Sequence, residues 1–179
     1  MKLDRIVTVA DGSRMEIRSI RRGEAEALRQ IRLRALADSP DAFGARLADE
    51  ATLAPEAWDE RAAKGAMGTD DATFVAEGAG GLIGMVTARR DLDTRDRVGL
   101  YGLWVEPGAR GAGVGRALTD AVLDWAGSRG ARLVHLLVVA GNAHALAVYR
   151  RAGFAETGRT IPLPRDPSVM EIEMVRHLA

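Results

Sequence analysis

The residues best placed to do chemistry form one short run near the middle of the chain, Arg110-Gly-Ala-Gly-Val-Gly-Arg116. An apolar stretch at 100–105 precedes the run and an amphipathic stretch at 114–125 follows it, which predicts a strand, a glycine-rich turn and a helix. The glycines leave the main chain bare, so that N–H groups at the helix N-terminus can approach an anion. The chemistry that this run predicts is the binding of a phosphate group.

The spacing within the run narrows the choice of phosphate ligand. A nucleoside-triphosphate loop needs lysine and then serine or threonine after its second glycine, but Val114 and Gly115 stand there. A dinucleotide turn needs a third glycine, and Arg116 or Leu118 occupies that position, depending on which pair of glycines is taken as the first. Both nucleotide interpretations are therefore disfavoured.

A second segment downstream also has the spacing of a binding site. Asn142 precedes Tyr149 by seven residues, and Gly153-Phe154 follows. Seven helical residues turn through about 700° and rise roughly 10 Å, so the two side chains lie on one face of a helix. One face can serve a single extended ligand.

Together the two segments resemble the coenzyme site of the GNAT N-acetyltransferase superfamily, whose signature Arg-x-x-Gly-x-Gly matches Arg110 to Gly115. The stretch 33–44 also resembles many bacterial members of unassigned substrate. The resemblance covers residues 100–154 well and the remainder loosely. It implies an α/β fold with a mixed, largely antiparallel sheet flanked by helices, in which splayed parallel strands form an acetyl-CoA cleft.

The resemblance also implies roles for individual residues. Main-chain groups of the strand before the turn would pair with the pantetheine arm, and the turn, its flanking arginines and Asn142 would contact the rest of acetyl-CoA. Tyr149 would be the acid for the departing thiolate, since an unperturbed phenol keeps its proton at neutral pH. The predicted coenzyme-binding residues are Leu103, Trp104, Val105, Arg110, Gly111, Ala112, Gly113, Val114, Gly115, Arg116, Asn142 and Tyr149.

Several of these residues also have a purely structural explanation. Leu103 and Val105 suit core packing, Asn142 is a favoured helix N-cap, and Tyr149 suits a half-buried helix position. A general base is not singled out by spacing, and the candidates are Glu77, Glu106, Asp91, Asp93 and Asp96. His135 is expected to be a satisfied core residue and His144 to face solvent.

The acceptor side is less well defined by the sequence. Helices are predicted at 24–37 and 55–64, with an irregular segment at 38–53 between them. By resemblance these elements shape the acceptor pocket, with the 91–97 loop opposite. Phe43, Trp58 and Tyr101 could line that pocket, although ordinary packing explains large apolar side chains equally well.

The remaining pattern predicts mostly strands. Apolar runs at 6–10 and 15–20 flank Asp11-Gly12, which predicts a hairpin; alternatively, residues 1–14 are an extension before a single domain at 15–179. A second hairpin is predicted at 73–77 and 82–87, and a strand-helix-strand unit spans 98–139. Its last strand, 132–139, lacks alternation, so we expect both of its faces to be covered. Further strands are predicted near 154–159 and at 169–175, with a proline-bearing loop at 161–164 between them.

Composition excludes several functions. The chain has 25 Lys plus Arg and 25 Asp plus Glu, and this balance disfavours nucleic-acid binding. The absence of cysteine excludes disulfides and an acyl-cysteine intermediate. Histidine and carboxylate spacing gives no metal site, so no metal cofactor is expected. With neither a signal-peptide pattern nor a membrane-spanning apolar run, a cytoplasmic protein without membrane contacts is expected.

The sequence therefore predicts an acetyl-CoA-dependent N-acetyltransferase that transfers the acetyl group directly to a primary amine of a small molecule or a protein. The alternative is an acyl-CoA-binding sensor without turnover. The sequence leaves open whether the protein forms a homodimer.

Overall fold

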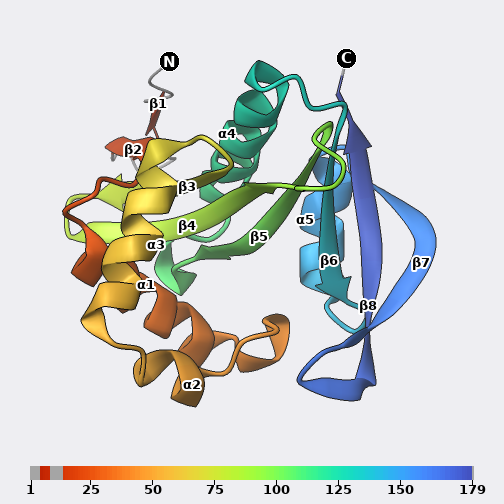
Figure 1. Cartoon of the computed structure of the whole chain (residues 1–179), viewed down its shortest axis with the longest axis horizontal. Helices are drawn as coiled ribbons and strands as arrows, with labels where there is room; N and C mark the ends of the chain where they lie inside the picture. The colour runs from red at the N-terminus through yellow and green to blue at the C-terminus, as the bar shows by residue number, and fades with distance from the viewer. Residues whose placement is uncertain (1–4, 9–13, 179) are drawn as a thin grey trace.

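A mixed β-sheet forms the middle layer of this computed structural model, which describes residues 5–8 and 14–178 (Figure 1). Within that part of the chain the sheet order is β1-β2-β3-β4-β5-β6-β8-β7. The strands are β1 (Arg5–Thr8), β2 (Arg14–Ser19), β3 (Asp71–Gly78), β4 (Gly81–Arg90), β5 (Arg97–Val105), β6 (Leu133–Val139), β7 (Ala155–Leu163) and β8 (Asp166–His177). The predicted hairpins at β1–β2 and β3–β4 are antiparallel pairs, although Asp11-Gly12 lies outside the described residues.

Helices pack on both faces of the sheet and build two hydrophobic cores. On the front face lie α1 (Ala25–Asp38), α2 (Leu47–Ala51) and α3 (Pro55–Met67); α4 (Val114–Ser128) and α5 (Ala143–Arg151) lie behind (Figure 1). Short 3-10 turns occur at η1 (Pro40–Ala42) and η2 (Pro107–Ala109). Among the described helices, none is long and apolar enough to cross a membrane.

The strands β5 and β6 form a parallel pair that soon separates. Their register pairs are limited to residues 97–99 of β5 with 133–135 of β6, while β6 continues along its whole length with β8. Beyond Gly99 and His135 the two strands therefore present main-chain groups that have no partner across the pair. The predicted fold class, a largely antiparallel mixed sheet with splayed parallel strands, is confirmed.

A bulge in β5 reverses the direction of the side chains that follow it. Thr87 of β4 pairs with Tyr101 of β5. Met85 lies two residues before Thr87, but its partner Trp104 lies three residues after Tyr101, so β5 contains one extra residue. Gly102 supplies the extra residue at φ +62°, a conformation that favours glycine. As a result Trp104 packs on the front core, and Leu103 packs on the back core.

Three sequence predictions are wrong in detail. The front face of β6 is not covered by a helix: Leu137 is 38% exposed, so the strand alternates in burial despite its apolar sequence. The predicted proline loop at 161–164 is mostly strand, because Pro162 lies in β7, an edge strand that can spare a donor. The segment predicted to be irregular contains α2, whose single turn is too short to show a helical period.

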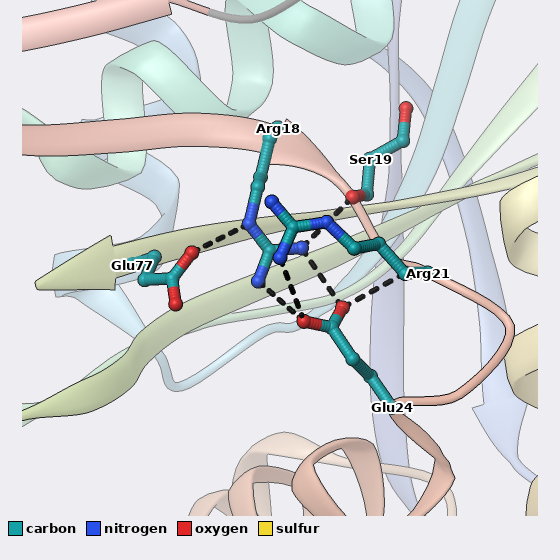
Figure 2. Close-up of polar contacts among 5 residues, drawn as sticks. All are labelled: Arg18, Ser19, Arg21, Glu24 and Glu77. Atoms are coloured by element: carbon teal, nitrogen blue, oxygen red, sulfur yellow. Dashed lines mark hydrogen bonds and ion pairs between the residues drawn. The ribbon is translucent and has the colours of Figure 1, made fainter.

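An ion-pair network fixes the start of α1 against the sheet. Figure 2 shows the Arg18 guanidinium between two carboxylates: Nε donates to Glu77 at 2.6 Å, and Nη1 and Nη2 donate to Glu24 at 2.8 and 2.6 Å. Burial alone would lower the pKa of Arg18, but these hydrogen bonds outweigh it and raise the pKa. The network joins β2, β3 and the residue that precedes α1, and thereby positions the helix that covers the front of β4.

Replacing Arg18 with methionine is expected to destabilise the fold by about 2–3 kcal/mol. Removal of the cation leaves Glu77 without its ion pair and Glu24 with Arg21 alone; the cost is below that of a fully buried pair because Arg21 remains and Glu77 is 37% exposed. Urea unfolding measures the change. The matched control is Arg14→Met at an exposed position of the same strand, expected to stay within about 0.5 kcal/mol of the parent. Equal midpoints for the two variants would contradict the structural role of Arg18.

Candidate active site

The glycine-rich turn ends in an open helix N-terminus. Gly111 and Gly113 adopt φ values of +81° and +86°, which place the chain in the left-handed region before α4. Gly113 is the N-cap of α4, and no side chain caps the helix. The first main-chain bond of α4 is from Ala117 N to Gly113 O at 3.0 Å, so the N–H groups of Val114, Gly115 and Arg116 have no acceptor within the helix. This arrangement can bind an anion.

The two arginines that flank the turn already have partners in the protein. Arg110 donates through Nε to Val105 O at 2.9 Å and also pairs with Asp38 at the end of α1. Arg116 donates through Nε to both carboxylate oxygens of Asp120, at 2.9 and 3.0 Å. Their side chains are half exposed, and a coenzyme contact from either would share or replace these bonds. Their predicted role in binding pyrophosphate stays a prediction.

The side chains of the predicted donor strand are occupied by packing. Leu103 and Val105 pack against the core under α4, while Trp104 donates from Nε1 to Asp38 Oδ2 at 2.9 Å. The hydrogen bond from Trp104, with those from Ser39 and Arg110, lowers the pKa of Asp38 to about 2. Asp38 therefore stays ionised at neutral pH and ties α1 to both the donor strand and the glycine turn. The sequence analysis did not identify this residue.

The second predicted motif forms α5 behind the sheet. Asn142 is the N-cap, and its Oδ1 accepts from Ala145 N at 3.0 Å, which leaves the amide NH2 group for another partner. Tyr149 is 9% exposed, and its ring meets Phe154 edge-on at 5.8 Å. Burial raises the pKa of Tyr149, so that its phenol keeps a proton throughout the neutral range. Asn142 thus has a structural role as a helix cap, and Tyr149 has one in core packing.

A cavity of about 500 Å³ lies on the front of the sheet, between α1, α3 and strands β3 to β5. Trp58, Tyr101 and the bulged Gly102 line it, as does Glu50, which pairs with Arg61 at 2.8 Å. Phe43 does not line it; its ring packs under Arg32 at 5.0 Å. Two of the three predicted acceptor-side aromatic residues therefore meet at this cavity. No group of metal-binding side chains occurs in the described part of the chain.

The candidate bases named from the sequence mostly have cationic partners. Glu77 binds Arg18, Glu106 binds Arg34 at 2.7 Å, and Asp91 lies 3.6 Å from Arg97. Asp91 Oδ1 also lies 3.1 Å from His135 Nε2. Asp93 and Asp96 are exposed in the loop before β5. His135 is thus satisfied by Asp91, and His144 is exposed, both as expected.

One half-buried carboxylate was missed by the sequence analysis. Glu171 lies in β8, beside the end of β6, and none of the described residues forms a hydrogen bond or ion pair with its carboxylate. Burial raises its pKa. The alternation of Met170-Glu-Ile-Glu-Met174 is the signal that could have placed Glu171 and Glu173 on one face.

The fold and the site define a class of protein: a mixed-sheet α/β domain with an anion-binding turn next to a splayed parallel pair. Residues 32–154 match the sequence model of the acetyltransferase (GNAT) family, a range that includes both motifs. The chain belongs to this family. The resemblance to GNAT proteins is thereby confirmed, and the matched range contains the glycine turn, α4 and α5.

Two curated relatives carry specific names. The streptothricin acetyltransferase of Streptomyces lavendulae is 33% identical over 165 residues, covering 85% of this chain and 87% of the relative. A mycothiol acetyltransferase of Amycolatopsis mediterranei is 42% identical over 91 residues, which are 48% of this chain. That match spans only 30% of the mycothiol enzyme.

Solved structures of other proteins share this fold. An acetyltransferase of the GNAT family from Streptococcus pneumoniae superposes with a TM-score of 0.80 at 21% identity, over 92% of this chain and 99% of the other. A putative acetyltransferase from Salmonella typhimurium, solved with its cofactor acetyl-CoA, gives 0.73 at 19% identity, over 92% and 94%. At these identities the likeness supports the architecture.

Proposed function

We propose that this protein is an acetyl-CoA-dependent N-acetyltransferase that transfers the acetyl group directly to a primary amine of a small molecule. The observation that carries the proposal is the position of the glycine turn: it follows β5, the strand that separates from β6, and opens at the N-terminus of α4. An anion-binding turn at the end of an unpaired strand edge suits a ligand with a diphosphate and an extended amide-bearing arm.

The main chain of this protein fits such a donor. The turn would hold the diphosphate through N–H groups of residues 114–116, and the unpaired edge of β5 around Leu103 to Val105 would pair with the arm. At the bulge, an N–H group near Leu103 would hold the thioester oxygen as negative charge develops on it. Acetyl-CoA, when bound, supplies an activated acetyl group with a thiolate leaving group.

Tyr149 would stabilise the departing sulfur. Because burial raises the pKa of its phenol, full proton transfer to a thiolate of pKa near 8.5 is unfavourable, and we infer that Tyr149 acts mainly by donating a hydrogen bond. The amide NH2 of Asn142 would hold the arm of the donor from the same helix face. Together these groups orient the donor and lower the charge on sulfur.

The acceptor would reach the thioester from the front of the sheet, where the cavity touches the bulge at Gly102. Streptothricin and mycothiol acetyltransferases are named for small molecules, and both are similar in sequence to this chain. A small amine is therefore the acceptor that we favour over a protein.

Acetyl-CoA and CoA are expected to raise the melting temperature by roughly 5–10 °C at 100 times their Kd, whereas ATP and NAD are not. The reason is that the turn lacks the lysine and the third glycine that those nucleotides need. Differential scanning fluorimetry with the four ligands measures the shifts. Stabilisation by ATP or NAD alone would remove both the transferase and the acyl-CoA sensor.

Release of free thiol from acetyl-CoA separates an enzyme from a sensor. The amines to be tested are streptothricin, spermidine, L-lysine, L-methionine and an alanine-terminated peptide. The protein itself contributes no thiol, since it has no cysteine. Amine-dependent thiol release supports the transferase, and binding without release for every amine would favour the sensor.

A further inference from the structure

We propose that Glu171 is the base that accepts a proton from the acceptor's ammonium group. The inference rests on the N-acetyltransferase function proposed above and adds to it a residue.

Glu171 points to the front of the sheet. In β8 the side chains of Ile172 and Met174 pack into the core on the side of α4 and α5. Because neighbouring side chains of a strand point to opposite faces, Glu171 and Glu173 point to the other side. This is the face on which α1 and α3 cover β3 to β5, and on which an acceptor would approach.

The neighbours of Glu171 across the sheet are aliphatic. It pairs with Val139 at the end of β6 and with Ile161 of β7, so the three side chains form one row on the front face. Adjacent strands lie about 4.8 Å apart, a distance that a glutamate side chain spans. The carboxylate can therefore reach the edge of β6 that faces the separated strand β5.

Two segments close the end of this face. Arg165, in the turn between β7 and β8, donates to Phe43 O at 2.8 Å and to Pro40 O at 3.0 Å, and η1 contacts β6. The loop after α1 is thereby held against the β7–β8 turn at the lower end of the sheet (Figure 1). This enclosure, together with the aliphatic row, partly removes Glu171 from water.

The charge of Glu171 is uncompensated, in contrast to that of its neighbour. Glu173 lies 3.7 Å from Arg97 and 3.5 Å from Arg159, and accepts from Thr157 at 2.9 Å. The carboxylate of Glu171 has no hydrogen bond or ion pair to any described residue.

Two other titratable groups on the surrounding elements are already paired. His135 on β6 binds Asp91, and Asp41 on η1 faces Arg165. A partly buried carboxylate without a cation can pair with an ammonium ion, and burial raises the pKa of Glu171.

The proposed acetyl transfer conserves atoms and charge. The ammonium group gives one proton to Glu171, and the neutral nitrogen forms a bond to the thioester carbonyl carbon. The carbon–sulfur bond breaks with its electron pair on sulfur. A second nitrogen proton balances the one that sulfur takes up, and Glu171 returns its proton to solvent. The products are the acetamide, the free thiol of CoA and one proton.

The test compares Glu171→Gln, Glu171→Asp and the exposed control Glu56→Gln with the parent, using whichever of the five amines above gives the highest kcat/KM. For Glu171→Gln we expect kcat/KM at pH 7 to fall by about 10²-fold, with a smaller loss in Glu171→Asp and none in the control. The loss should shrink as the pH approaches the pKa of the amine used, about 8 for a peptide α-amino group and about 10 for a side-chain amine, because the amine then needs no base. The melting temperature and the Kd for acetyl-CoA should stay unchanged.

The outcomes are distinguishable. A parent protein that releases no thiol with any amine overturns the proposed function, and the inference with it. An active parent with an unaffected Glu171→Gln variant overturns the base alone. A loss in Glu171→Gln that is equal at every pH, or that lies wholly in the acceptor KM, shows binding without proton transfer and also overturns it.

Discussion

Tyr149→Phe is expected to lower kcat by about 10²-fold or more while leaving the Kd for acetyl-CoA within a few-fold of the parent. The substitution removes only the hydroxyl group, and the ring keeps its edge-on contact with Phe154. Because burial raises the pKa of Tyr149, the parent should also show no loss of activity from phenol ionisation up to pH 10. Steady-state thiol release across pH and equilibrium binding of acetyl-CoA provide the measurements.

A packing control separates the chemistry of Tyr149 from its place in the core. Phe154→Leu disturbs the same aromatic contact but keeps the phenol, so we expect a stability loss of about 1 kcal/mol with turnover within twofold at 25 °C. If Tyr149→Phe turns over at the parent rate, Tyr149 has no part in the rate-limiting step. If both variants lose turnover equally, the motif contributes packing instead.

Gly113→Asp is expected to raise the KM for acetyl-CoA by about 10²-fold or more, since it places a carboxylate where the diphosphate would bind. Two unit charges about 4 Å apart near a protein surface repel by roughly 4 kcal/mol, enough for an effect of this size. Space does not prevent the substitution, because no atom lies within 4 Å of a Cβ at this position. Steady-state kinetics with varied acetyl-CoA measures KM.

Gly113→Asn is the matched control for this variant. Gly113 has φ +86°, which strains most side chains, but Asn and Asp tolerate the left-handed region comparably and have nearly the same shape. The Asn variant should therefore share the strain without the charge, and its KM should rise by no more than about tenfold. Equal KM values for the two variants would mean that no anion binds at the turn.

The coenzyme side of the candidate site was predictable because its determinants are local. The glycines, the helix that follows them and the Asn142 to Tyr149 spacing are read within single segments, and the functional groups in the turn are main-chain N–H groups that depend on few other residues. The strand-helix-strand order of β5, α4 and β6 also follows from local pattern. The structure bears these elements out with bounds that differ by a few residues.

The wrong predictions concern features that depend on residues far away in the sequence, which a local pattern does not identify. The apolar sequence of β6 suggested two covered faces, yet no helix covers its front, and Leu137 is 38% exposed. The sequence also gave no sign that Asp38, at the end of α1, would accept from Trp104 and pair with Arg110. These contacts join residues that are more than 60 positions apart.

The sequence by itself therefore determined the family and the two motifs of the candidate donor site, while the tertiary structure decided the candidates for the acceptor side. Trp58 comes from α3, Tyr101 from β5 and Glu171 from β8, and only the packing of front helices and the order of strands brings these elements to one face. The sequence offered five acids as candidate bases without singling one out, and three of them form ion pairs with arginines, two of which lie far along the chain. Whether a carboxylate lacks a cation depends on all the elements around it, and that information exists only after folding.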